Sequence, residues 1–207
     1  MTEAAPTRRG RPSRTNGESA GRRAAILAAA RESFAAQGFR GTTIRGVARA
    51  AGVDPALVHH YFGSKDDLFL AALEVPIDPR TVLPALLEGD LETAADRLLR
   101  TVLTIWDEPV VRLQLAALFR TALASPAESN PLRDGLLPLV LGPLTARLPG
   151  PDAEHRAQLV VTQMMGLLVT RYVLALEPLA SVPREQVVAS VAPNLQRYLT
   201  GELAPEV

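Results

Sequence analysis

Two short helical segments joined by a tight turn occupy residues 42–62, and they constrain the fold more than any other part of the sequence. The first segment follows Thr43 and ends at Gly52, and the second has Asp54 as its N-cap and Pro55 as its first residue. Small alanine residues near the turn allow two such helices to pack closely at a steep angle. This pattern predicts a helix-turn-helix.

The remainder of the sequence also has helical periodicity. A first helix is predicted from about residue 19 to Gly38, because apolar residues recur there at three- and four-residue steps, and a fourth is predicted from Ser64 to about Glu74. Further helices are predicted at about 80–88, 91–107, 109–125, 132–148, 153–177 and 184–199. Proline and glycine residues inside the segment 132–148 should kink or split it. The predicted fold is all-α.

Charge is divided unevenly along the chain, although the formal net charge is zero. Residues 1–65 carry eleven Lys and Arg against four Asp and Glu, a net charge of +7, so the remainder carries −7. Such a division is typical of a module that binds a polyanion, followed by one that does not. Both short helices also begin with unpaired backbone N–H groups, which can hold phosphates. We therefore expect the first third of the chain to bind DNA.

The first third of the chain resembles the TetR family of repressors over roughly residues 22–70. The matching residues are Ile26-Leu27-Ala28-Ala29-Ala30-Arg31-Glu32-Ser33-Phe34, Gly38-Phe39, Thr42-Thr43-Ile44-Arg45, Val47-Ala48, Ala51-Gly52-Val53 and His60-Tyr61-Phe62-x-Ser64-Lys65-x-x-Leu68. Further along, the resemblance rests on length and helical character. It implies a sequence-specific DNA-binding transcriptional regulator, a repressor that a small apolar effector releases from its operator.

The resemblance also implies how the chain is divided. Residues 1–18 are expected to form a flexible basic arm, since they lack apolar periodicity. Residues 19–66 would form the three-helix, helix-turn-helix DNA-binding domain, and residues 67–204 a helical domain for effector binding and dimerisation. Cytoplasmic homodimers of this kind bind double-stranded DNA at palindromic operators, with recognition helices about 34–36 Å apart.

Site residues follow from the family pattern, position by position. Four residues match positions that contact phosphates in the family: Thr42, Thr43, Tyr61 and Lys65. Arg45 occupies the place where the supporting helix approaches the DNA backbone or a groove edge. Residues expected to face the bases are Pro55, Ala56, Leu57, His59 and His60.

Two of these residues depart from the usual family pattern. Leu57 stands where a polar Thr or Ser is common, so it either contacts a thymine methyl group or turns inward. His59 replaces a tyrosine. The base preference of the family should therefore not be transferred to this chain.

The basic arm has two interpretations. Arg9-Gly10-Arg11-Pro12 resembles the core of an AT-hook, in which arginines enter a narrow minor groove. The alternative is a tail that only increases solubility. We favour a DNA contact by Arg9 and Arg11.

The C-terminal helices are expected to supply the dimer interface and the effector site. The segment 153–177 is apolar on several faces, so that segment and 184–199 should pack against their copies in a partner subunit. An apolar cavity is expected among the helices of 80–148, bounded below by the fourth helix. Candidate effector contacts are Trp106, Gln114, Phe119, Thr162 and Gln163.

Other classes of protein have less support. The chain has no cysteine and three histidines, and the adjacent His59 and His60 point about 100 degrees apart, so we expect no metal site and no cofactor. It lacks a nucleophile elbow, a zinc-protease helix and a phosphate-binding glycine loop, so we expect no enzyme. No apolar run is long enough for a membrane span. The remaining alternative is a helical adaptor that binds proteins and has no regulatory DNA site.

Overall fold

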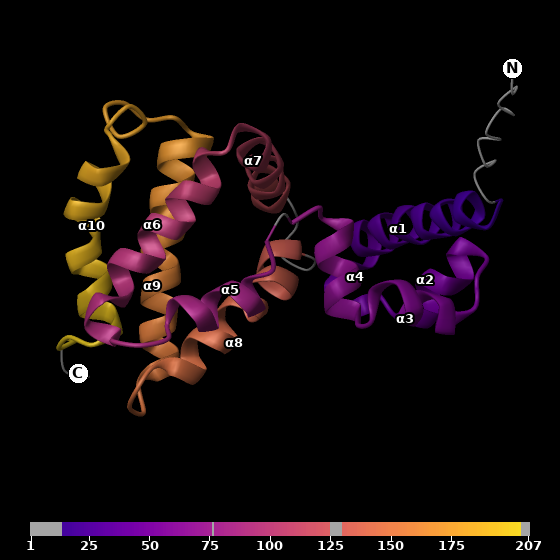
Figure 1. The fold of residues 1–207 in the computed structure, drawn as a ribbon, viewed down its shortest axis with the longest axis horizontal. Coiled ribbons are helices and arrows are strands. Elements are labelled where there is room, and N and C mark those ends of the chain that lie inside the picture. Colours follow the sequence, from indigo (N-terminus) through magenta and orange to yellow (C-terminus); the bar gives the residue numbers. More distant parts are fainter. Residues whose placement is uncertain (1–13, 76, 125–129, 204–207) are drawn as a thin grey trace, which may run out of the picture.

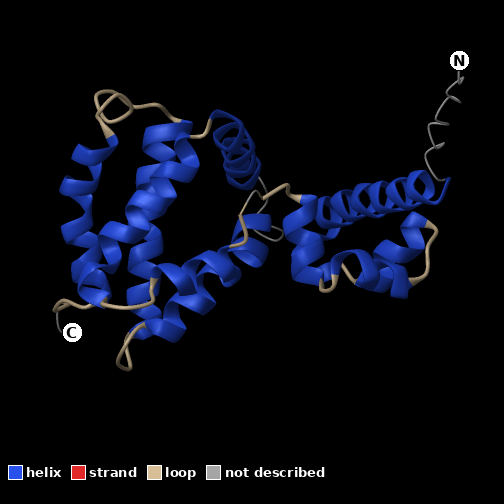
Figure 2. Ribbon diagram, viewed as in Figure 1, coloured by secondary structure: helices blue, strands red, loops and turns tan. Residues whose placement is uncertain are grey.

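The structure is a computed structural model that describes residues 14–75, 77–124 and 130–203. Every regular element in these ranges is a helix, which confirms the predicted all-α fold (Figure 2). The helices form two units that lie side by side, a smaller one of α1–α4 and a larger one of α5–α10 (Figure 1). We call these the head and the body.

The head contains the two short helices at its core. Its elements are α1 (Arg14–Gly41), α2 (Ile44–Ala51), α3 (Pro55–Phe62) and α4 (Lys65–Ala72). Ile26, Val47, Val58, Leu68 and Phe69 have no exposed surface, so one apolar residue or more from each helix fixes the centre of the head. The predicted arrangement of helices is therefore present.

Helix α1 is longer than predicted at both ends. It begins at Arg14, so residues 14–18 belong to a helix instead of the expected flexible arm, and residues 1–13 lie outside the described part. Gly38 interrupts it with φ 67° and ψ 179°, a conformation that L side chains rarely adopt. The break turns Phe39 back against Phe34, and the two rings stack with centroids 6.0 Å apart.

The body is a bundle whose core is mostly leucine. Its elements are α5 (Pro79–Leu86), η1 (Leu91–Thr93), α6 (Ala94–Asp107), α7 (Pro109–Ala124), η2 (Leu132–Leu136), α8 (Leu137–Arg147), α9 (Ala153–Leu168), η3 (Val169–Val173) and α10 (Arg184–Leu199). Leu99, Leu103, Leu195 and Leu199 are fully buried where α6 packs against α10. The predicted helix positions agree with these bounds to within a few residues, apart from the end of the segment 153–177.

Two of the predicted long helices contain a π-helical turn. The segment 132–148 consists of the π-turn η2, which continues directly into α8, and Pro138 is the second residue of α8. The segment 153–177 ends earlier than predicted, with the π-turn η3 after α9. No helix in the described ranges has the length and apolarity that a membrane crossing requires.

Candidate functional site

The starts of α2 and α3 are fixed by side-chain caps. The Thr43 hydroxyl accepts a hydrogen bond from the backbone N–H of Gly46 at 3.0 Å, and Asp54 Oδ1 accepts one from the N–H of Ala56 at 2.7 Å. A Cβ on Gly46 would lie 3.1 Å from Thr43 Oγ1, which is a tight contact. The glycine inside α2, unfavourable for a helix by itself, therefore leaves room for the cap.

Helix α3 buries one face and exposes the other. Val58 and Phe62 are buried in the head, whereas Ala56, His59 and His60 are exposed, and Leu57 is half-buried. On α2, Arg45 and Arg49 are exposed too. The exposed face of α3 and the arginines of α2 are thus both accessible to a polyanion.

The imidazole of His59 has a fixed polarity. Its Nδ1 lies 2.7 Å from the carbonyl oxygen of Gly63, which ends α3. Since a carbonyl oxygen can only accept, Nδ1 carries the proton and donates it. In the tautomer that carries its only ring proton on Nδ1, Nε2 is the acceptor.

Tyr61 connects α3 with the start of α1. Its hydroxyl lies 2.8 Å from Ser19 Oγ and donates to the carbonyl oxygen of Ser19 at 3.2 Å. The two residues stand 42 positions apart, so the contact fixes the first turns of α1 beside α3. The hydroxyl that the sequence assigned to a phosphate is therefore occupied within the head.

Thr42 is placed differently from the sequence expectation. It is 1% exposed, and both its hydroxyl and its backbone N–H donate to the carbonyl oxygen of Gly38, at 2.8 and 3.3 Å. The cause is the break at Gly38, which directs that carbonyl toward the α1–α2 turn. Thr42 thus braces the turn, and an expected phosphate contact by its side chain does not fit this placement. Thr43 beside it is exposed.

Lys65 is held at the first position of α4. Its Nζ lies 4.4 Å from the centroid of the Phe39 ring, a cation–π distance. Partial burial lowers the pKa of Lys65, against a smaller opposing influence of Asp66. The start of α4 has a full capping box, because Ser64 Oγ accepts from the Asp67 N–H at 3.1 Å and Asp67 Oδ2 accepts from the Ser64 N–H at 3.0 Å.

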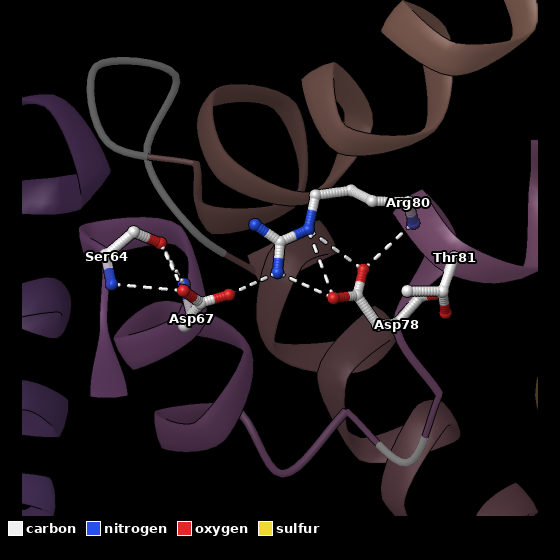
Figure 3. A network of polar contacts seen from close by, with 5 residues as sticks. All are labelled: Ser64, Asp67, Asp78, Arg80 and Thr81. Atoms are coloured by element: carbon white, nitrogen blue, oxygen red, sulfur yellow. Dashed lines mark hydrogen bonds and ion pairs between the residues drawn. The ribbon is translucent and has the colours of Figure 1, made fainter. Parts of the chain in front are cut away.

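A network of charged side chains continues from this cap into the body (Figure 3). Arg80 Nε donates to both carboxylate oxygens of Asp78, at 3.0 and 3.1 Å, and Arg80 Nη2 donates to Asp67. Hydrogen bonds from Ser64, followed by Arg80, lower the pKa of Asp67, and hydrogen bonds from Arg80 lower the pKa of Asp78. One guanidinium therefore joins α4 of the head to α5 of the body.

An apolar cavity of about 210 Å³ lies inside the body. An engineered cavity of about 150 Å³ holds benzene, so this one has room for a somewhat larger apolar molecule. Trp106 forms part of the wall, with its ring 5.4 Å from that of Phe119. The lining is apolar throughout and consists of Val75, Ile77, Pro79, Val82, Leu83, Leu86, Leu98, Val102, Ile105, Trp106, Leu115, Phe119, Leu132, Leu136, Leu137, Val140, Leu144, Val160, Val161, Met164, Met165 and Leu168.

Two family profiles match the chain, one in the head and one in the body. The profile described as "Bacterial regulatory proteins, tetR family" matches residues 26–72, and the profile "Tetracyclin repressor-like, C-terminal domain" matches residues 92–199, just over half of the chain. The chain belongs to the TetR family.

Solved structures of TetR-family proteins share this architecture. A TetR-family regulator from Streptomyces coelicolor A3 is 35% identical, with 91% of this chain and 97% of that chain covered and a TM-score of 0.53. A regulator described as a TetR-family protein from Mesorhizobium loti is 15% identical over 87% of this chain and 96% of its own, with a TM-score of 0.50, and shows the fold alone.

Curated TetR-family relatives match a smaller share of the chain. The transcriptional regulator BetI of Rhizobium meliloti is 48% identical over 52 residues, which are 25% of this chain and 26% of the relative. The regulator HbdR of Aromatoleum is 39% identical over 69 residues, 33% of this chain and 30% of the relative. The chain thus matches less than a third of the length of these relatives.

The TetR-family body separates the residues predicted to contact an effector. Trp106 and Phe119 line the cavity. Thr162 and Gln163 lie on the other face of α9, in a surface groove lined by Leu159, Thr162, Gln163, Gly166, Leu167, Thr170, Leu179, Val191 and Tyr198. Gln114 is half-buried on α7 and is not part of the cavity wall.

Several cavity residues were missed by the sequence analysis. The methionines and valines of α9 line the cavity, although the effector site was predicted among the helices of 80–148. The link between α4 and α5 closes the side nearest the head, through Val75, Ile77 and Pro79, where the fourth helix was expected. A helical period of apolar residues on α9 was the available signal, but it does not distinguish a cavity wall from solid core. Arg9 and Arg11 lie outside the described residues.

Proposed function

We propose that this chain is a DNA-binding transcription regulator in which α3 enters the major groove and α2 lies across the DNA backbone. The observation that carries the proposal is the exposed face of α3, with Ala56, His59 and His60 accessible beside Arg45 on the neighbouring helix. Lys65 and Thr43 are partly or fully exposed at helix starts and would contact phosphates. Arg9 and Arg11 would add contacts in a flanking minor groove.

Regulation by a small apolar molecule fits the cavity. Its wall contains no charged side chain, so a charged ligand would lose hydration without a partner, whereas an apolar ligand would not. Trp106 and Phe119 would contact the effector. Repression relieved by the effector is the outcome we propose. BetI and HbdR, each similar to part of this chain, are transcriptional regulators.

A homodimer would supply two heads for a palindromic operator. The groove on the outer face of α9 combines apolar residues with Gly166 and Thr162, which would allow a second copy of the helix to approach closely. Thr162 and Gln163 would then contact the partner subunit instead of the effector. The apolar cavity lies against the opposite face of α9, through Val160 and Met164.

DNA binding can be tested by fluorescence anisotropy on duplexes from upstream of the chain's own gene, with a scrambled duplex as control. Six to ten phosphate contacts per complex would give a log–log salt slope of about −5 to −9, and the upstream duplex should bind more tightly than the control. A slope near zero, or equal affinity for both duplexes, would argue for the adaptor instead.

A further inference from the structure

The π-turn η2 is shared between the head and the body. Leu132 and Leu136 line the cavity, and Leu136 also packs against the apolar core of the head. Gly135, between them, is buried. π-turns are rare and are often found at functional sites. Any movement of this turn is therefore transmitted to both the cavity wall and the head.

Gly135 is required for space and not for backbone conformation. It is not among the described glycines with positive φ. A Cβ at this position would lie 3.0 Å from Cε2 of Phe69, and closer still to Cζ and Cε1 of the same ring. A methyl group and the ring of Phe69 cannot both occupy this place, so η2 and α4 meet here in direct contact.

Phe69 cannot easily turn away from that contact. Its ring is fully buried and makes edge-to-face contacts with Phe34 and Phe39, at centroid distances of 5.0 and 4.9 Å. Phe39 in turn contacts Lys65, whose amine lies over the Phe39 ring. A displacement of Phe69 would thus shift the rings beneath a proposed phosphate contact.

The link between α4 and α5 provides a parallel connection. Ile77 and Pro79 line the cavity, whereas Asp78 and Arg80, which alternate with them, join the network that reaches Asp67. A molecule that fills the cavity would therefore also act on the head through this second set of contacts. The two connections differ, because Gly135 packs against an aromatic ring and Arg80 forms ion pairs.

We propose that Gly135 and Phe69 are positioning residues, whose packing sets where the head stands relative to the body and transmits the filling of the cavity to the DNA-binding face. This inference rests on the proposed function, in which the head binds DNA and the cavity binds an apolar molecule. Neither residue touches DNA or effector. An occupant of the cavity that moves η2 would reposition the head through the contact of Gly135 with Phe69.

The test is Gly135→Ala in the full chain, with bromobenzene as the probe. Trp106 is the only tryptophan in the sequence and lines the cavity, so quenching of its fluorescence by the heavy atom reports binding directly. We expect Gly135→Ala to weaken DNA binding about fivefold or more and to keep the quenching constant within about twofold of the parent value. In the parent protein bromobenzene should weaken DNA binding, and the variant should lose most of this effect.

Gly142→Ala is the matched control, because a Cβ at residue 142 of α8 meets nothing within 4 Å. It should leave the DNA affinity and the probe effect as in the parent protein. If both alanine variants behave alike, or if Gly135→Ala retains the parent DNA affinity and probe effect, the positioning role is overturned.

Combining Gly135→Ala with Phe69→Leu guards against a folding defect, since the shorter side chain makes room for the methyl group. We expect the double variant to have the helical circular dichroism of the parent protein and to recover most of the DNA affinity lost in Gly135→Ala. No recovery in a folded double variant contradicts the proposal. A parent protein that binds no DNA refutes the proposed function itself, whereas DNA binding unaffected by bound bromobenzene refutes the transmission through Gly135.

Discussion

Arg80, the second residue of α5, donates a hydrogen bond to Asp67 in the first turn of α4, so this side chain links the body to the head. Because hydrogen bonds from Ser64 and Arg80 lower the pKa of Asp67 below its ordinary value of 3.8, its ionised form stabilises the fold above about that pH. This stabilisation is lost as the pH falls through the lowered pKa. We expect the free energy of unfolding to fall more steeply between about pH 5 and pH 2 in the parent protein than in Asp67→Asn.

Urea unfolding at several pH values measures this difference. Asp66→Asn is the control in the same helical turn, because Asp66 is outside the network of Arg80, and it should retain the steep fall. Equal pH dependence in the parent protein and Asp67→Asn would exclude a stabilising role for the ionised Asp67.

The hydrogen bond between Tyr61 and Ser19 should contribute to stability. Tyr61→Phe is expected to lower the free energy of unfolding by about 1 kcal/mol, and Ser19→Ala by less, because the carbonyl oxygen of residue 19 still accepts from Tyr61. The double variant should be no less stable than Tyr61→Phe alone. Chemical denaturation of the four proteins checks this cycle. A loss of DNA affinity in Tyr61→Phe that is the same for all duplexes would instead place the hydroxyl on a phosphate.

Lys65 and His59 should have different effects on DNA recognition. Lys65→Ala is expected to weaken all duplexes alike and to reduce the salt slope by about 0.9, since a phosphate contact carries no sequence information. His59 presents Nε2 as an acceptor, so it should favour the amino group of adenine or cytosine in the major groove. Selection of bound sequences with His59→Ala should therefore lose this preference at one position of each half-site. A uniform loss of affinity in both variants contradicts the assignment of His59.

A larger side chain in the wall of the cavity should either mimic an effector or block its binding. Val160 is 1% exposed and borders the cavity, so Val160→Phe places a ring where a ligand would bind. We expect bromobenzene to quench Trp106 at least about fivefold less effectively in this variant, with a loss in the free energy of unfolding of no more than about 3 kcal/mol. Unchanged quenching would show that the probe binds elsewhere.

The outer face of α9 should hold two subunits together. Gly166→Arg introduces a charged side chain into the groove lined by Thr162 and Gln163, and we expect it to convert a dimer to a monomer in sedimentation experiments at micromolar concentration. Gly142→Arg, on α8, is the control and should remain dimeric. A dimer in both variants would place the interface elsewhere.

Features determined by neighbouring residues could be predicted from the sequence. The start and end of α3 follow from Asp54, Pro55 and Gly63, each of which acts on backbone groups within its own turn. The capping box of Ser64 and Asp67 is likewise local. Such signals explain why the helix-turn-helix and most helix positions in the body were predicted correctly.

Features that depend on distant contacts could not be predicted. The burial of Thr42 depends on the break at Gly38, and the sequence pattern alone assigned its hydroxyl to DNA. No local sequence signal indicates the role of Gly135, which in the fold makes room for Phe69, 66 positions earlier in the chain. Periodicity indicates which face of α9 is apolar, but not that part of this face borders an empty space.

Sequence-specific DNA binding by the head is the central proposal for this protein, and selection of bound duplexes from a random-sequence pool measures it directly. We expect an enriched inverted repeat, whose half-sites are one helical turn or a multiple of it apart, about 34–36 Å per turn, as two copies of α3 would require. A pool without an enriched motif after repeated rounds of selection would contradict the account.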